Sequence, residues 1–120
     1  MSKTVVAVVD DMFFIAKIRA VAESIDVKVR FVRNVEAMIS AVTESAAALV
    51  IVDLQSQKVS PVEVAKRLKA DPVLAAIPLL GFYSHVETEL RAEAEKAGYD
   101  RVMPRSAFSA NLAQILAESL

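Results

Sequence analysis

The strongest constraint on the fold is a fivefold alternation of short apolar runs with helical patterns. Continuous apolar runs at residues 5–9, 48–52 and 77–83 predict strands that are buried on both faces of a sheet. Residues 27–31 alternate apolar and basic side chains, and the run at residues 101–103 is short, so both predict edge strands. Five βα units joined by right-handed crossovers form a parallel sheet with helices on both faces.

Capping signals place the helices between these runs. Asn34 is a good N-cap, and residues 60–63 form a capping box with proline at the first helical position. Residues 84–87 repeat the capping-box pattern, and Gly98 suits the end of the helix that follows. We therefore expect one doubly wound α/β domain over residues 1–120, with strand order 2-1-3-4-5 and a switch point between strands one and three.

The composition indicates one folded domain and excludes several classes of partner and ligand. The 120 residues suit one domain, and 55% hydrophobic residues with a mean hydropathy of +0.42 are enough for a packed core. A net charge of −1 gives no reason to expect nucleic acid or an anionic membrane as a partner. The absence of cysteine and of a signal or spanning segment indicates a cytoplasmic protein. Two glycines are too few for a glycine-rich nucleotide loop.

Three aspartates follow strands that meet at the predicted switch point. Asp10 and Asp11 end the first strand, and Asp53 ends the third. Adjacent carboxylates repel one another and raise each other's pKa unless a cation neutralises them, and Mg²⁺ prefers such oxygen ligands. One carboxylate is then available as a nucleophile toward a phosphoryl group. The alternative is structural, since Asp10 or Asp11 also suits the N-cap of the first helix.

Four segments carry a resemblance to the receiver domains of bacterial two-component response regulators, which have a flavodoxin-like fold. The likeness spans nearly the whole chain and is strongest at residues 8–11, 50–53, 77–80 and 98–100. It implies that Asp53 accepts a phosphoryl group from a histidine kinase or a phosphotransfer protein. It also implies that Asp10, Asp11 and Asp53 bind Mg²⁺ together with the backbone carbonyl of Gln55.

The chain departs from this family at the residues that read out phosphorylation. Tyr83 stands at the place of the family's Ser or Thr on strand four, and Ser84 follows it. Ser84 serves there after a one-residue shift, or else it only caps the next helix. Arg105 stands at the place of the strand-five Lys, with Pro104 before it instead of a proline after it. Val102 replaces the strand-five aromatic residue.

Two functions fit these residues. The first is a receiver that is not an enzyme, in which phosphorylation of Asp53 alters binding to a downstream effector protein. The resemblance implies that partners, including a second copy of the chain, meet the face formed by the fourth helix, the fifth strand and the fifth helix. Tyr99, Met103 and Phe108 are expected to form an apolar patch there. The second is a pseudo-receiver, a protein-interaction module that phosphorylation does not regulate.

Overall fold

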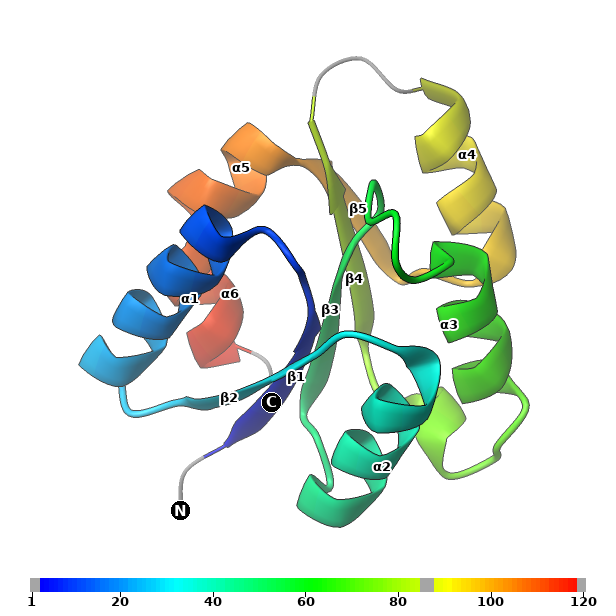
Figure 1. Cartoon of the computed structure of the whole chain (residues 1–120), viewed down its shortest axis with the longest axis horizontal. Helices are drawn as coiled ribbons and strands as arrows, with labels where there is room; N and C mark the ends of the chain where they lie inside the picture. Colours follow the sequence, from blue (N-terminus) through cyan, green and yellow to red (C-terminus); the bar gives the residue numbers. More distant parts are fainter. Residues whose placement is uncertain (1–2, 85–87, 119–120) are drawn as a thin grey trace.

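A parallel five-stranded sheet forms the centre of the computed structural model, which describes residues 3–84 and 88–118 (Figure 1). The strand order is β2-β1-β3-β4-β5, as predicted. All four neighbouring pairs run parallel. The strands are β1 (Thr4–Val8), β2 (Lys28–Val32), β3 (Leu49–Asp53), β4 (Leu79–Tyr83) and β5 (Arg101–Pro104).

The helices cover both faces of the sheet (Figure 1). One face carries α1 (Met12–Ser24), α5 (Arg105–Ala110) and α6 (Leu112–Glu118), and the other carries α2 (Val35–Ser45), α3 (Pro61–Lys69) and α4 (Thr88–Ala97). A short 3₁₀ helix, η1 (Leu74–Ala76), precedes β4. None of the described helices combines the length and the apolar character that crossing a membrane requires.

Burial follows the predicted distinction between central and edge strands. Every residue of β3 and β4 is buried, and β1 is buried except at its first residue. In β2 exposed and half-buried residues alternate over the first four positions, as expected of an edge. Side chains of successive strand residues enter opposite cores. Val50 and Val52 pack toward α2 and α3, while Ile51 packs with residues of α1 and α6.

Local capping explains most helix boundaries. The side chains of Asn34 and Ser60 accept backbone N–H groups at the starts of α2 and α3. Gly98 follows α4 with φ of +117°, a conformation in which a residue with a Cβ is strained. The second predicted capping box begins at Ser84, but its residues 85–87 lie outside the described part of the chain.

Two predictions about the C-terminal region are wrong. The fivefold alternation predicts one helix after the fifth strand, but Asn111 separates α5 from α6, because its backbone (φ −112°, ψ 17°) departs from helical values. The Ala107 carbonyl accepts both the backbone N–H (3.1 Å) and the side-chain amide (2.9 Å) of Asn111. The expected apolar patch also does not form, since Phe108 is 0% and Tyr99 is 6% exposed. The Tyr99 hydroxyl donates to the Pro61 carbonyl (2.8 Å), which ties the end of α4 to the start of α3.

Candidate functional site

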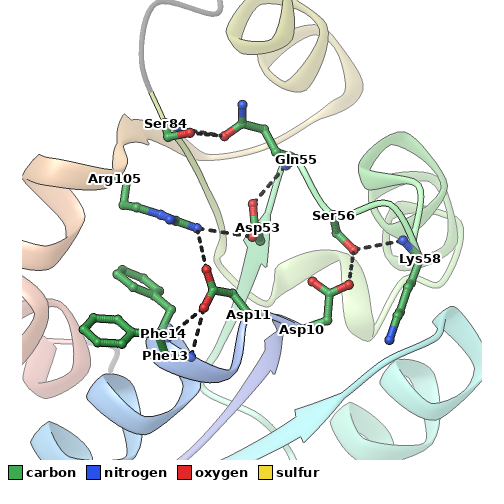
Figure 2. Close-up of polar contacts among 10 residues, drawn as sticks. All are labelled: Asp10, Asp11, Phe13, Phe14, Asp53, Gln55, Ser56, Lys58, Ser84 and Arg105. Atoms are coloured by element: carbon green, nitrogen blue, oxygen red, sulfur yellow. Dashed lines mark hydrogen bonds and ion pairs between the residues drawn. The ribbon is translucent and has the colours of Figure 1, made fainter.

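The topology brings two of the predicted acids together at the carboxyl end of the sheet. Asp53 is the last residue of β3, and Asp10 and Asp11 follow β1, its parallel neighbour. Parallel neighbours end at the same edge, so all three aspartates lie at that edge without any special loop. Figure 2 shows Asp11 and Asp53 directed toward a common cation, the guanidinium group of Arg105.

Asp53 is the most enclosed of these acids. It is 5% exposed, and it is the only charged side chain that is buried among the described residues. The Gln55 N–H donates to its Oδ1 (3.0 Å), and its Oδ2 lies 3.6 Å from an Arg105 Nη. Burial raises the pKa of Asp53, and the charges of Asp10 and Asp11 add to this. The Gln55 N–H and the Arg105 charge oppose the rise in pKa without cancelling it.

Asp11 serves the helix and the site at the same time. Its Oδ1 accepts the backbone N–H groups of Phe13 (2.9 Å) and Phe14 (3.2 Å), so it is the N-cap of α1. Its Oδ2 lies 3.6 Å from the same Arg105 nitrogen that faces Asp53. The capping role that the sequence left open is therefore real for Asp11, and it fixes the direction of the remaining carboxylate oxygen.

Asp10 lies on the other side of the cluster. Its Oδ2 is 3.4 Å from the Ser56 hydroxyl, and Ser56 Oγ also accepts the Lys58 N–H (3.3 Å). Consecutive residues of an extended chain point to opposite sides, which explains why Asp10 and Asp11 diverge. Asp10 thus faces the loop between β3 and α3 in this structure (Figure 2).

The guanidinium group of Arg105 lies close to two aromatic rings. Its Cζ lies 4.8 Å from the centroid of the Phe14 ring and 5.7 Å from that of Phe82. Behind them Phe82 stacks on Phe108, with centroids 4.7 Å apart and an interplanar angle of 3°. Such contacts stabilise a cation at a ring face. The rings of Phe14 and Phe82 and the carboxylates of Asp11 and Asp53 together hold the guanidinium beside Asp53.

Tyr83 and Ser84, the two candidates for the switch position, differ in burial and in their contacts. Tyr83 is 6% exposed and packs in the core beneath α2, α3 and α4. Ser84 is half-buried, and its backbone N–H (2.6 Å) and hydroxyl (2.8 Å) both donate to the Gln55 side-chain oxygen. Ser84, rather than Tyr83, therefore carries the hydroxyl on the loop side of the site (Figure 2).

The donor set suits Mg²⁺. No group of three or more carboxylate, imidazole or thiolate side chains converges on one point in residues 3–84 and 88–118. However, Mg²⁺ in proteins usually binds one or two carboxylates and keeps several waters. Asp11 and Asp53 already face one common cation, so they fit such an ion. Asp10 is near enough for its charge to raise the pKa of Asp53, and Gln55 is two residues after Asp53.

Replacing Asp53 by Asn is expected to stabilise the protein. The pKa of Asp53 is raised in the folded protein. The protonated side chain therefore favours folding at pH values below the unfolded-state pKa, and this stabilisation is lost as the pH rises through the folded-state pKa. At neutral pH the buried charge is a cost, and Asp53→Asn should raise the free energy of unfolding by about 1 kcal/mol. Urea unfolding in EDTA checks this, and the gain should shrink toward about pH 4. A loss of stability at neutral pH would contradict it.

Sequence inspection missed the surroundings of Arg105 and Asp10. Phe14, Phe82 and Ser56 were not among the predicted site residues. The side chain of Gln55 was also overlooked, because the resemblance concerns only its backbone carbonyl. The position of Phe14 three residues after Asp11 was an available signal, since it places the ring in the first turn of the capped helix.

Comparison of the structure with solved proteins gives consistent neighbours. A response regulator from Hahella chejuensis is 23% identical with a TM-score of 0.86, covering 99% of this chain and 96% of that chain. The phosphorylated cyanobacterial phytochrome response regulator is 22% identical with a TM-score of 0.78, covering 97% and 89%. The receiver domain of a Pseudomonas aeruginosa sensor histidine kinase is 15% identical with a TM-score of 0.82, covering 97% and 95%.

These likenesses define the fold. The chain has the flavodoxin-like fold of response-regulator receiver domains, over nearly its whole length. The Pseudomonas receiver domain is described with a magnesium ion coordinated in its active-site cleft. No protein-family model matches the chain, and no curated protein matches its sequence.

Proposed function

We propose that this chain is a receiver in a phosphorelay and that Asp53 is its phosphoacceptor. One observation carries the proposal: the only buried charged side chain of the described residues stands at the carboxyl end of a central strand. A second carboxylate and a guanidinium group face it there. The neighbours with the same fold are response regulators and receiver domains, which supports the same role.

The proposed chemistry is transfer of a phosphoryl group to a carboxylate. An Oδ atom of Asp53 forms a bond to phosphorus while the bond between phosphorus and a nitrogen of the donor histidine breaks. The electron pair of that bond stays on the imidazole, which leaves as the product side chain. The donor is a histidine kinase or a phosphotransfer protein. Only the ionised carboxylate is nucleophilic, and the Gln55 N–H and the Arg105 charge both favour that form of Asp53.

Mg²⁺ fits the proposal as a cofactor. Asp11 and Asp53 would hold it, with Asp10 and the backbone carbonyl of Gln55 completing the oxygen donors. When bound, the ion supplies positive charge to the oxygens of the transferring group. The magnesium described in the Pseudomonas receiver domain supports this cofactor.

The response to phosphorylation would pass through Ser84 and Arg105. Ser84 donates to Gln55 in this structure, and its hydroxyl can donate to a phosphoryl oxygen only by leaving that partner. Arg105 provides positive charge beside Asp53. We propose that this exchange alters the surface of α4, β5 and α5, where a downstream effector protein or a second copy of the chain binds. The proposal includes a cytoplasmic signalling role without enzymatic turnover or nucleic-acid binding.

A pseudo-receiver remains the second candidate. It is favoured by Tyr83, which stands at the switch position but is buried in the core. Val102 at the aromatic position of β5 also lacks the ring that would report a switch. In this alternative the fold binds its partner without phosphorylation.

Phosphoryl loading of Asp53 tests the two candidates directly. The wild type should gain the mass of one phosphoryl group from acetyl phosphate with millimolar Mg²⁺, and beryllofluoride should shift amide NMR signals near Asp53 and Ser84. Asp53→Asn should show neither change. Asp26→Asn is the matched control, because Asp26 is an exposed aspartate between α1 and β2, and it should load like the wild type. No loading of the wild type would sink the phosphoreceiver and favour the pseudo-receiver.

A further inference from the structure

The outer edge of β2 is a free strand edge. Among the described strands β2 ends the sheet, and it pairs with β1 on its other side (Figure 1). The Lys28 N–H donates to the Lys3 carbonyl (2.9 Å), so Lys28 directs its backbone toward β1. Successive residues of a strand direct their N–H and C=O groups to alternate sides, so Val29 and Phe31 direct theirs away from the sheet. The backbone groups of these two residues are therefore available to a further strand.

The two faces of β2 differ in chemistry. Val29 and Phe31 are half-buried and pack against the core that includes α1. Lys28 and Arg30 are exposed on the opposite face, where Arg30 pairs with Glu44 of α2 (3.2 Å). Both members of this ion pair are exposed, so the pair is weak and leaves Arg30 able to bind another carboxylate. The strand thus presents apolar side chains on one face and cations on the other.

An open hollow of about 500 Å³ lies between the end of α1 and this edge. Ala22, Val27 and Val29 give it an apolar lining. Charges of both signs, including those of Arg19 and Glu23, surround this lining, so the hollow has no strong preference for an ion of either sign. An added strand that directs a side chain toward α1 would bury it here, and that burial is favourable for an apolar side chain.

A second copy of the chain is a poor occupant of this edge. Antiparallel pairing of β2 with itself would bring Lys28 and Arg30 of both copies to the same face. Like charges that face one another in neighbouring strands are destabilising, and cations on edge strands commonly prevent such pairing. The same cations favour a strand that carries carboxylates on that face.

We propose that the outer edge of β2 binds an extended segment of a partner protein in which acidic and apolar residues alternate. The segment adds one strand to the sheet by bonding to the backbone of Val29 and Phe31. Its carboxylates face Lys28 and Arg30, and its apolar side chains enter the hollow beside α1. The period of two in β2 thus selects the complementary period in the partner. This binding does not depend on phosphorylation of Asp53.

Peptide titration followed by NMR and amide hydrogen exchange tests the proposal. The probe is a capped peptide of about seven residues in which glutamate and valine alternate. It should shift the amide signals of β2 and slow exchange at Val29 and Phe31, whose N–H groups become hydrogen-bonded. Exchange at Arg30 should change little, because its N–H already faces β1. A peptide with glutamates and valines in separate blocks, and one with lysine in place of glutamate, should bind at least about tenfold more weakly.

Removing the cations of β2 tests the charge pairing. Lys28→Gln combined with Arg30→Gln should weaken binding about tenfold, because both cross-strand charge pairs are lost. Arg91→Gln combined with Lys96→Gln is the matched control on α4. It also removes one lysine and one arginine, and Arg91 is likewise in an exposed ion pair, with Glu95 (3.6 Å). This control should bind the peptide like the wild type, and thermal melts verify that both variants are folded.

Several results would overturn the proposal. One is absence of binding between the wild type and the alternating peptide at millimolar concentration. Others are equal binding of the block or lysine peptide, equal slowing of exchange at Arg30 and at Val29, or equal affinity of the cation variant and its control. Sedimentation that shows the free chain pairing through β2 would instead make a second copy the occupant.

Discussion

Replacing Phe108 by Ala is expected to lower the free energy of unfolding by about 3–5 kcal/mol, the usual cost of removing a large buried ring. Phe108 is 0% exposed and stacks on Phe82 at 4.7 Å. Phe14 packs against both rings, with centroids 5.0 Å from Phe82 and 5.7 Å from Phe108. The cavity would therefore open inside a cluster that close packing keeps rigid, and the rings that seat Arg105 would lose their support.

Urea unfolding of Phe108→Ala beside Phe13→Ala checks this expectation. Phe13 is 83% exposed at the start of α1, so its removal should change the free energy of unfolding by no more than about 0.5 kcal/mol. The two substitutions delete the same ring from neighbouring helices, and only burial differs. Equal effects of the two substitutions would contradict the aromatic cluster described above.

Replacing Gly81 by Ala is expected to destabilise the fold by about 1–3 kcal/mol through overpacking. A Cβ on Gly81 would lie 2.7 Å from Leu54 Cδ2 and 2.9 Å from Leu54 Cγ. Leu54 is 2% exposed, so its side chain has little free space into which it can turn. Leu54 directly follows Asp53, and its N–H donates to the Phe82 carbonyl. The strain should therefore reach the phosphoacceptor as well as the core.

A double-mutant cycle with Leu54→Ala isolates the contact between the two side chains. Leu54→Ala alone leaves a cavity and should cost about 2–5 kcal/mol. In Gly81→Ala with Leu54→Ala the new methyl group enters that cavity, so the double variant should lose less stability than the two single variants together. Additive losses would show that the steric contact is not the cause.

Much of the fold could be predicted because its determinants are local. The apolar runs and their alternation depend on the period of a strand, and Asn34, Ser60 and Gly98 act on the helix ends beside them. The break at Asn111 is an exception. The apolar stripe of Phe108, Leu112 and Ile115 continues across it, so the helical pattern does not reveal that the backbone of one residue leaves helical angles.

Within the site, the sequence alone determined that Asp53 and the pair after β1 end neighbouring strands, since the strand order follows from burial. Only the tertiary structure decided what each carboxylate faces. Asp11 and Asp53 meet Arg105, whereas Asp10 turns to Ser56. These contacts join segments that are far apart in the chain, and they depend on side-chain rotamers and on the stacking of rings from three elements. Strand and helix periodicity carries no information about such packing. The contacts of the carboxylates therefore become visible only in the tertiary structure, where the ends of β1, β3 and β5 lie at one edge of the sheet.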